Sequence, residues 1–286
     1  MSGKLALVAI ALLAGSAQAL AHDLPAPAPT ESAPITIGTT HRVAFAPGDM
    51  REVNVYFPPD YDGETPLPVL YLLDGGLDQD FLHVAGTSAL NALWGRSQPV
   101  IVVGIQTKDR RAELIGSRGT DEEQGLYPTA GNAGAFRAFL RDTVKPLVEA
   151  NYRTSGDDAV IGESLAGLFI VETWIGEPAL FDRYAAINPS LWWDDQALAR
   201  FAAAAAVDGQ NRGQILISYS NEGPETQTAV EMVADAALEL GCLVPRPDLT
   251  HATAYHILTP SVLQWLFPTG YEFEPEWGFD TGCAQG

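Results

Sequence analysis

The residues with the clearest chemical potential lie around Ser164. The apolar run Val160-Ile161 leads into the small-residue turn 162–167, GESLAG, and an apolar helical pattern follows it. A serine on a tight strand-to-helix turn projects its hydroxyl clear of the sheet, and the N–H of the next residue faces a developing oxyanion. The pattern predicts Ser164 as a nucleophile and Leu165 as an oxyanion donor. Taken alone, a serine between glycines also fits an ordinary turn or helix cap.

A serine hydroxyl is a weak nucleophile and needs a base within hydrogen-bond reach. Two histidines, His251 and His256, follow Ser164 in the chain. His251 follows a proline-containing stretch and precedes a predicted closing helix, so we expect it on a loop and assign it as the base. His256 falls at the start of that helix, where a packed or capping histidine is the simpler account.

An acid that orients the base is expected after the predicted strand 215–219. The loop reads SNEGPE, and Glu222 lies closest to the end of the strand. It would accept the second imidazole proton and stabilise the imidazolium. Glu225 and Asp248 are rivals for this role, and a solvated loop glutamate is the alternative.

A second oxyanion donor is expected where the apolar segment 69–73 ends in Asp74-Gly75-Gly76. Glycines after a strand leave backbone N–H groups free to point at a developing charge, and we assign this role to Gly76. A plain turn is the alternative, because such glycine pairs are common.

Short β-branched runs alternate with helical patterns along the chain, which predicts an α/β fold with a mostly parallel central sheet and helices on both faces. Residues 53–57 alternate in polarity like an outer strand, and residues 241–248 lack a clear pattern. The other expected strands are 69–73, 100–105, 159–161, 184–187 and 215–219. The expected helices are 133–150, 165–175, 196–206, 226–240 and 256–267.

Both ends of the chain differ from this pattern. Residues 1–21 resemble a secretory signal, with Lys4 before an apolar run that is too short to span a bilayer. A Pro- and Ala-rich tether, 22–34, precedes the expected catalytic domain, 35–270, and a tail, 271–286, follows it. We therefore expect a periplasmic or secreted protein with no membrane insertion after signal removal. Cys242 and Cys283 permit one disulfide in an exported chain, and two free thiols are the alternative.

The charge of the chain excludes one class of partner. With 16 basic and 36 acidic residues, the net charge is −20. Nucleic acid is not an expected partner, because its binding requires basic residues that neutralise phosphates. Arg110 and Arg111 form a local basic pair after the strand 100–105, where they would meet an anionic substrate. Ion pairing with nearby acids is the alternative for these arginines.

As a set, these motifs resemble the putative-esterase branch of the α/β-hydrolases, which contains S-formylglutathione hydrolases and siderophore trilactone esterases. The resemblance covers about residues 45–267, and the segment 189–193, PSLWW, points to the siderophore-esterase-like members. It implies an α/β-hydrolase fold and an acyl-enzyme mechanism with no metal and no organic cofactor. Two departures are Glu163, where relatives often have histidine, and the segment 112–118, which lacks their Asp-Leu-Thr-Pro run.

The predicted function is that of a serine carboxylic-ester hydrolase, siderophore-esterase-like, acting on a small-molecule ester. An exported acyl or feruloyl-type esterase acting on carbohydrate-linked esters is the alternative within enzymes. A non-catalytic binding protein on a hydrolase scaffold is the alternative from another class. The sequence does not distinguish a Ser-His pair from a full triad, and it does not give the oligomeric state.

Overall fold

The computed structural model describes residues 31–59, 61–204 and 213–284. The expected signal, residues 1–21, and most of the expected tether lie outside the described residues. The residues from Ile37 onward form one compact unit, separate from the unit that precedes it. None of the helices in the described ranges is long and apolar enough to cross a bilayer.

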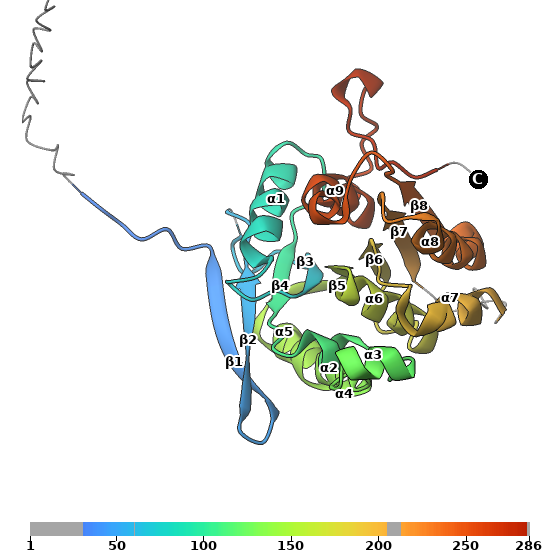
Figure 1. Ribbon diagram of the computed structural model, residues 1–286. Helices are drawn as coiled ribbons and strands as arrows, with labels where there is room; N and C mark the ends of the chain where they lie inside the picture. The colour runs from blue at the N-terminus through green and yellow to red at the C-terminus, as the bar shows by residue number, and fades with distance from the viewer. Residues whose placement is uncertain (1–30, 60, 205–212, 285–286) are drawn as a thin grey trace, which may run out of the picture. The chain divides into compact units, whose positions relative to one another are not determined.

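An eight-stranded mixed sheet organises this unit, in the order β1-β2-β4-β3-β5-β6-β7-β8 (Figure 1). Strand β2 pairs antiparallel with β1 and β4, and the remaining neighbours run parallel. The strands are β1 (Gly38–Ala46), β2 (Asp49–Tyr56), β3 (Leu67–Leu73), β4 (Ile101–Ile105), β5 (Thr154–Glu163), β6 (Arg183–Ile187), β7 (Gln214–Tyr219) and β8 (Gly241–Pro245). The predicted mostly parallel sheet is confirmed.

The prediction that residues 53–57 form an outer strand was wrong. Residues 53–56 lie in β2, which is covered on its outer edge by β1, and Phe57 follows the strand. The polar residue that created the alternating pattern, Asn54, is only 1% exposed. Its side-chain amide donates to the carbonyl of Gly75 at 2.9 Å, so a specific hydrogen bond replaces water at this position.

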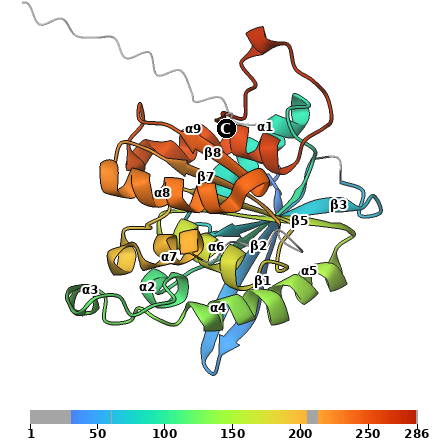
Figure 2. The same ribbon diagram turned by 90° about the vertical axis from the view of Figure 1, so that its right-hand side faces the viewer.

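Helices cover both faces of the sheet, as predicted (Figure 2). On one face, α1 and α9 pack together over an apolar layer that includes Leu70, Leu72 and Ile161. On the other face, α4, α5, α6, α7 and α8 contribute to the larger apolar layer. The helices are α1 (Phe81–Leu93), α2 (Arg110–Leu114), α3 (Asp121–Leu126), α4 (Ala133–Phe139), α5 (Lys145–Asn151), α6 (Leu165–Gly176), α7 (Trp193–Ala204), α8 (Pro224–Ala237) and α9 (His251–Leu266).

The helix predicted over 133–150 is divided by a π-helical turn, Leu140–Val144, between α4 and α5. Pro146 lies at the start of α5, where its missing N–H prevents a regular hydrogen bond to the preceding turn. Helix α7 begins at Trp193, three residues before the predicted start, and passes through a left-handed turn at Asp194–Gln196. The last two residues of that prediction, 205 and 206, lie outside the described residues.

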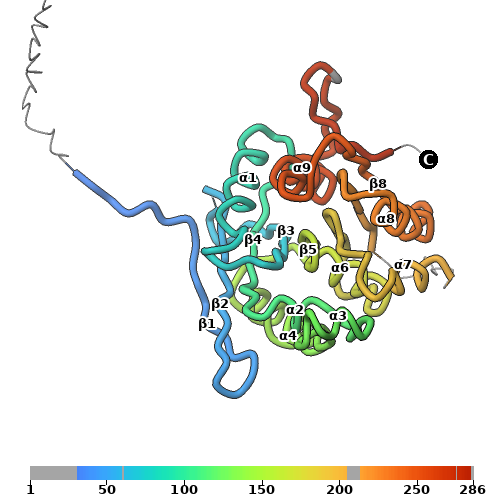
Figure 3. The backbone as a smooth tube through the Cα atoms, in the orientation of Figure 1, coloured from blue at the N-terminus to red at the C-terminus, as the bar shows by residue number. Residues whose placement is uncertain are grey.

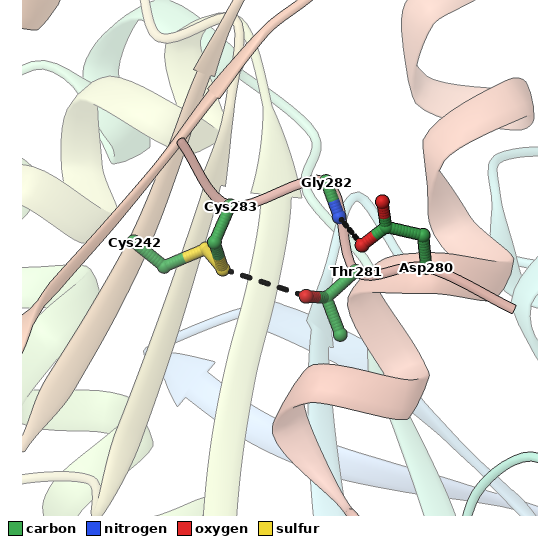
Figure 4. The surroundings of a disulfide bond; sticks show 5 residues. All are labelled: Cys242, Asp280, Thr281, Gly282 and Cys283. Atoms are coloured by element: carbon green, nitrogen blue, oxygen red, sulfur yellow. Dashed lines mark hydrogen bonds between the residues drawn. A yellow bond between two sulfur atoms is a disulfide. The ribbon is translucent and has the colours of Figure 1, made fainter. Parts of the chain in front are cut away.

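The stretch 241–248, which has no clear pattern, contributes the edge strand β8 and the loop that leads to α9. After α9 the chain leaves the domain and returns beside β8 (Figure 3), where the N–H of Ala284 donates to the carbonyl of Leu243 at 2.7 Å. A disulfide joins Cys242 of β8 to Cys283 (Figure 4). The predicted bridge is confirmed, and it holds the tail against the edge of the sheet.

Candidate active site

The carboxyl ends of the parallel strands meet at one edge of the sheet, and the predicted site residues follow those ends. Ser164 follows β5, Gly76 lies after β3, and Arg110 and Arg111 begin the short helix after β4. Glu222 lies after β7. Sheet topology therefore explains why residues so far apart in sequence lie in one region.

Ser164 has the backbone geometry of a nucleophile elbow. Its φ is 61° and its ψ is −118°, a strained conformation for a residue with a side chain. Its N–H donates to the carbonyl of Ile187 at 3.1 Å, and helix α6 starts at the next residue. The turn therefore lifts the serine from the end of β5 into the first turn of a helix.

The small residues around Ser164 are required by close approach of the backbone. A Cβ atom added to Gly162 would lie 2.6 Å from the Cβ of Ala166, and one added to Gly167 would lie 2.9 Å from the Cα of Pro189. The methyl group of Ala166 thus occupies the space that Gly162 leaves free. This explains why alanine serves in the position where such turns usually have glycine.

His251 and Glu222 form an ion-pair contact, with Nδ1 of the ring 2.8 Å from Oε1 of the carboxylate. The rivals lie elsewhere: Glu225 is exposed on α8, and Asp248 is exposed and paired with Arg246 at 2.7 Å. The carboxylate of Glu222 raises the pKa of His251, while partial burial and the charge of Arg110 act in the opposite direction. The arrangement favours a protonated imidazole next to Glu222.

Two polar residues hold the Glu222 loop in place. The hydroxyl of Ser220 donates to Oε2 of Glu222 at 3.4 Å, and the side-chain amide of Asn188 donates to that hydroxyl at 2.6 Å. Asn188 follows β6 with a left-handed φ of 44° and is buried. Glu222 is therefore positioned through contacts from two neighbouring strand ends.

The expectation that His251 lies on a loop was wrong, because it is the first residue of α9. The helix begins five residues earlier than predicted, since Thr250 caps it and exchanges hydrogen bonds with Thr253. His256 lies one turn further along this helix, exposed and close to the ring of His83, with 4.5 Å between the ring centroids. The ion pair of Glu222 is with His251 and not with His256.

Ser164 does not hydrogen-bond to His251 in this structure. Its hydroxyl instead lies 3.2 Å from that of Ser190, whose N–H donates to the carbonyl of Ser164 at 3.0 Å. Catalytic hydrogen bonds are often long in an empty site and tighten when substrate binds. The structure thus joins His251 to Glu222 and Ser164 to Ser190, but leaves the two pairs unlinked.

The two predicted oxyanion donors differ in whether their backbone N–H already has an acceptor. Within the described residues, no acceptor is found for the N–H of Leu165, which lies at the start of α6. The N–H of Gly76 donates to Oε1 of Gln79 at 2.9 Å. The side-chain amide of Gln79 is itself held by Thr107, to whose carbonyl it donates at 3.1 Å. Leu165 is available to a ligand as it stands, whereas Gly76 is occupied.

Arg110 and Arg111 line a cleft of about 730 Å³ together with Ser164, Ser190 and Trp192. Arg110 is paired with Asp74, its Nη2 lying 2.8 Å from the carboxylate, as the ion-pair alternative anticipated. Arg111 has no ion-pair partner in the described ranges, and its guanidinium lies over the ring of Tyr127, 4.5 Å from the centroid. Of these two arginines, Arg111 is the one whose charge is free to meet an anion.

The pairing of Arg110 stabilises an unusual turn. Asp74 follows β3 with a left-handed φ of 53°, and its carboxylate also accepts a hydrogen bond from the hydroxyl of Thr107. The next residue, Gly75, packs so closely on Gly104 that a Cβ atom would lie 2.3 Å from its Cα. Arg110 is therefore part of the support for the loop that carries Gly76.

Sequence reasoning missed Ser190, Asn188 and Gln79 as neighbours of the site. Ser190 belongs to the PSLWW segment, which was used only for the family resemblance. Asn188 directly follows a predicted strand, where a residue tolerant of left-handed backbone was an available signal. No local signal marks Gln79, because its role depends on the folded loop. Among the described residues, no cluster of histidine, cysteine and acidic side chains is arranged to hold a metal ion.

The sequence is similar to that of known esterases. A family model described as "Putative esterase" matches residues 45–239. The chain belongs to this esterase family. Among characterised relatives, the chain is 27% identical over 158 residues to the siderophore triacetylfusarinine C esterase of Aspergillus fumigatus, a match covering 50% of each chain. The match thus spans about half the length of that relative.

Solved structures share the fold of this chain. The BES protein from Bacillus cereus superposes with a TM-score of 0.72 over 84% of this chain and 99% of that chain, at 16% identity. An IroE-like serine hydrolase from Shewanella oneidensis superposes with a TM-score of 0.67 over 80% of each chain, at 23% identity. The fold is the α/β-hydrolase-like esterase fold that the sequence motifs predicted.

Proposed function

We propose that this protein is a serine carboxylic-ester hydrolase in which Ser164, His251 and Glu222 act as a triad. The observation that carries the proposal is the strained elbow at Ser164, at the same sheet edge as the 2.8 Å contact between His251 and Glu222. Membership of the esterase family supports it. A binding protein without activity would have no need for the backbone strain at Ser164.

In the proposed mechanism, Ser164 Oγ attacks the ester carbonyl as His251 takes its proton, and the carbonyl becomes an oxyanion held by the N–H of Leu165. Gly76 supplies a second donor once Gln79 Oε1 releases its N–H. The tetrahedral intermediate expels the alcohol, which receives the proton from His251. Water activated by His251 then attacks the acyl-enzyme, releases the acid and restores the Ser164 hydroxyl.

A fluorophosphonate probe tests this proposal. The probe should label the wild-type protein at a single residue, Ser164, and should not label Ser164→Ala. Labelling of His251→Ala should be strongly slowed, and His256→Ala should label like the wild type. Absence of labelling in the wild type, or loss of labelling in His256→Ala alone, would overturn the assignment.

For the substrate, we propose a multiply anionic siderophore-type ester, with Arg111 as the residue that recognises its charge. The name of the Aspergillus relative supports the ester class, and the unpaired guanidinium in the cleft supports the charge. The net charge of −20 repels anions at long range, so a local cation is needed. Carbohydrate-linked acyl or feruloyl esters lack this charge and are the alternative.

Variants of Arg110 and Arg111 distinguish an anionic siderophore-type ester from a carbohydrate-linked ester as the substrate. Arg111→Ala should lower kcat/KM for a siderophore trilactone about 5-fold and leave a neutral aryl ester unchanged, because an exposed ion pair contributes up to about 1 kcal/mol. Arg110→Ala should lower kcat/KM for both substrates to the same extent, because it removes the partner of Asp74 beneath the Gly76 loop. Equal effects of Arg111→Ala on both esters would exclude charge recognition.

We also infer that the protein is exported. The predicted signal 1–21 and the disulfide between Cys242 and Cys283 support an oxidising compartment. The mature N-terminus of protein recovered from the periplasm or medium tests this inference. A start within residues 18–24 is expected, and an intact Met1 in cytoplasmic protein would contradict it.

A further inference from the structure

Glu163 has no role in the proposed mechanism, although it is the last residue of β5 and directly precedes Ser164. Its side chain is partly buried, and Oε1 is shielded from solvent without a hydrogen-bond partner in the described part of the chain. An incompletely paired buried carboxylate lowers stability. Its presence beside the nucleophile therefore calls for a functional explanation.

The charged and titratable groups that face Glu163 come from three elements. From α9 it faces His251 and, one helical turn later, Tyr255. The side chain of Tyr255 is 1% exposed, and its hydroxyl also lacks a partner within the described residues. Asp80, before α1, adds a like charge, and Arg110 of α2 adds an opposite one.

In these surroundings, the protonation of Glu163 and the protonation of His251 depend on each other. Burial raises the pKa of Glu163 to about 7, while His251, the amide of Tyr255 and Arg110 favour its ionised form. In return, the charge of Glu163 raises the pKa of His251 in addition to the larger effect of Glu222. His251 thus faces two carboxylates, of which Glu222 is in contact with the ring and Glu163 acts across space.

We propose that Glu163 is a positioning residue that acts through His251: its carboxylate stabilises the imidazolium that forms as Ser164 loses its proton. The inference rests on the proposed roles of Ser164 and His251 and extends them to a second acid. Glu222 holds the ring by direct contact. Glu163 supplies negative charge from the nucleophile's own strand without occupying either ring nitrogen.

The sign of the effect follows from the chemistry. His251 must be neutral to accept the proton of Ser164, and a nearby negative charge favours its protonated form. With a pKa of about 7, Glu163 is partly ionised over the pH range in which His251, whose pKa is raised above 6.5, loses its proton. Replacing Glu163 by glutamine removes this partial charge, so His251 stays neutral to lower pH and the acid limb of activity moves down. The same replacement weakens the imidazolium in the transition state, so the rate on the alkaline plateau falls.

The experiment measures the rate constant of fluorophosphonate labelling of Ser164 from pH 5 to 9. In Glu163→Gln, the midpoint of the acid limb should fall by on the order of half a pH unit, as expected for one unit charge acting across several Å. The plateau rate should fall about 3-fold for the same reason. Glu163→Asp, which keeps the charge, should return both values most of the way to the wild type.

Asp248→Asn is the matched control, because it removes one negative charge three residues before His251 from an exposed side chain paired with Arg246. Its acid limb should not move at physiological ionic strength, where exposed charges are screened. If the midpoint of the acid limb shifted equally in Asp248→Asn and Glu163→Gln, the effect would depend only on the net charge of the protein, and the proposal would be overturned. An unchanged midpoint in Glu163→Gln would overturn it as well.

Thermal unfolding provides a readout that does not depend on the reaction. The folded-state pKa of Glu163 lies above its usual value of 4.5, so its ionisation opposes folding at pH above about 7, and this effect disappears below pH 4.5. Glu163→Gln should therefore melt at a higher temperature than the wild type at pH 8, and the difference should shrink as the pH falls. A variant that melts lower at pH 8 would contradict the burial argument.

Different results would refute the proposed serine-hydrolase function and the proposed role of Glu163. Wild-type protein that does not label at any pH would refute the serine-hydrolase function itself. Wild-type protein that labels normally, with an unchanged pH profile in Glu163→Gln, would refute only the role of Glu163.

Discussion

The elbow that presents Ser164 and the pair formed by His251 and Glu222 are built in different ways. The elbow consists of consecutive residues, 162–167, and depends on backbone conformation and on the small size of its side chains. The His251–Glu222 pair joins the first residue of α9 to the loop after β7, and contacts from Asn188 and Ser220 position Glu222. One region is specified locally, and the other is assembled by the sheet.

This difference predicts different consequences of mutation. In the elbow, a methyl group added to Gly162 or Gly167 must displace backbone or a neighbouring methyl group, so substitutions that enlarge these residues should lower stability. Around His251, the side chains are partly exposed and joined by polar contacts, so conservative substitutions should change the chemistry and leave the fold intact. The four predictions below test this contrast.

The largest effect is expected for Ser164→Ala. It removes the proposed nucleophile, and kcat for an aryl ester should fall by roughly 10⁶, as in serine hydrolases that lose this group. Its melting temperature should stay near that of the wild type, since only a hydroxyl bonded to Ser190 is lost. The double variant with His251→Ala should be hardly slower than either single variant, because the residues act as a unit. Additive losses would contradict a shared mechanism.

Glu222→Gln should lower kcat by about 10²–10⁴, because a neutral amide no longer stabilises the imidazolium. Steady-state kinetics with the same ester measure the loss. Glu225→Gln is the matched control three residues further on, at the start of α8, and should retain the wild-type rate, because Glu225 is exposed and the ion pair of His251 is with Glu222. If Glu222→Gln kept the wild-type rate, a Ser-His pair would be the working unit.

Reduction of the Cys242–Cys283 bridge should lower the free energy of unfolding by about 3–4 kcal/mol, since the bridge closes a loop between residues 41 positions apart. Denaturant unfolding with and without reductant measures the change. The bridge holds the tail to β8, away from the contact between His251 and Glu222, so the folded protein should keep its kcat. A loss of activity without unfolding would show that the tail supports the site.

Gly162→Ala should lower the free energy of unfolding by about 1–3 kcal/mol, because its methyl group would lie 2.6 Å from that of Ala166. Adding Ala166→Gly should recover much of this loss by removing the opposing methyl group. Gly176→Ala is the matched control at the other end of α6, where an added Cβ meets nothing within 4 Å. Equal destabilisation of both single variants would argue against a steric elbow.

Most of the fold could be predicted from the sequence, because buried parallel strands are marked by continuous apolar runs. The elements that were missed carry weaker signals. Strand β1 has a half-exposed pattern at the edge of the sheet, and α2 and α3 are too short to show helical periodicity. Helix α1 was also missed, because the face that it buries includes the polar residues Ser88 and Asn91. The early start of α9 depends on a cap formed by two threonines, which apolar periodicity does not report.

The sequence by itself determined the elbow at Ser164, because neighbouring residues create its strain and its close packing. It also limited the candidates for the base to two histidines and those for the acid to three residues, because the order of the strands limits which segments reach the sheet edge that carries Ser164. Tertiary structure alone decided that Glu222 rather than Glu225 meets His251, that Arg110 is paired while Arg111 is not, and that Gln79 occupies the N–H of Gly76. Those outcomes depend on distances between loops that are far apart in sequence, and such distances exist only once the sheet has brought the loops together.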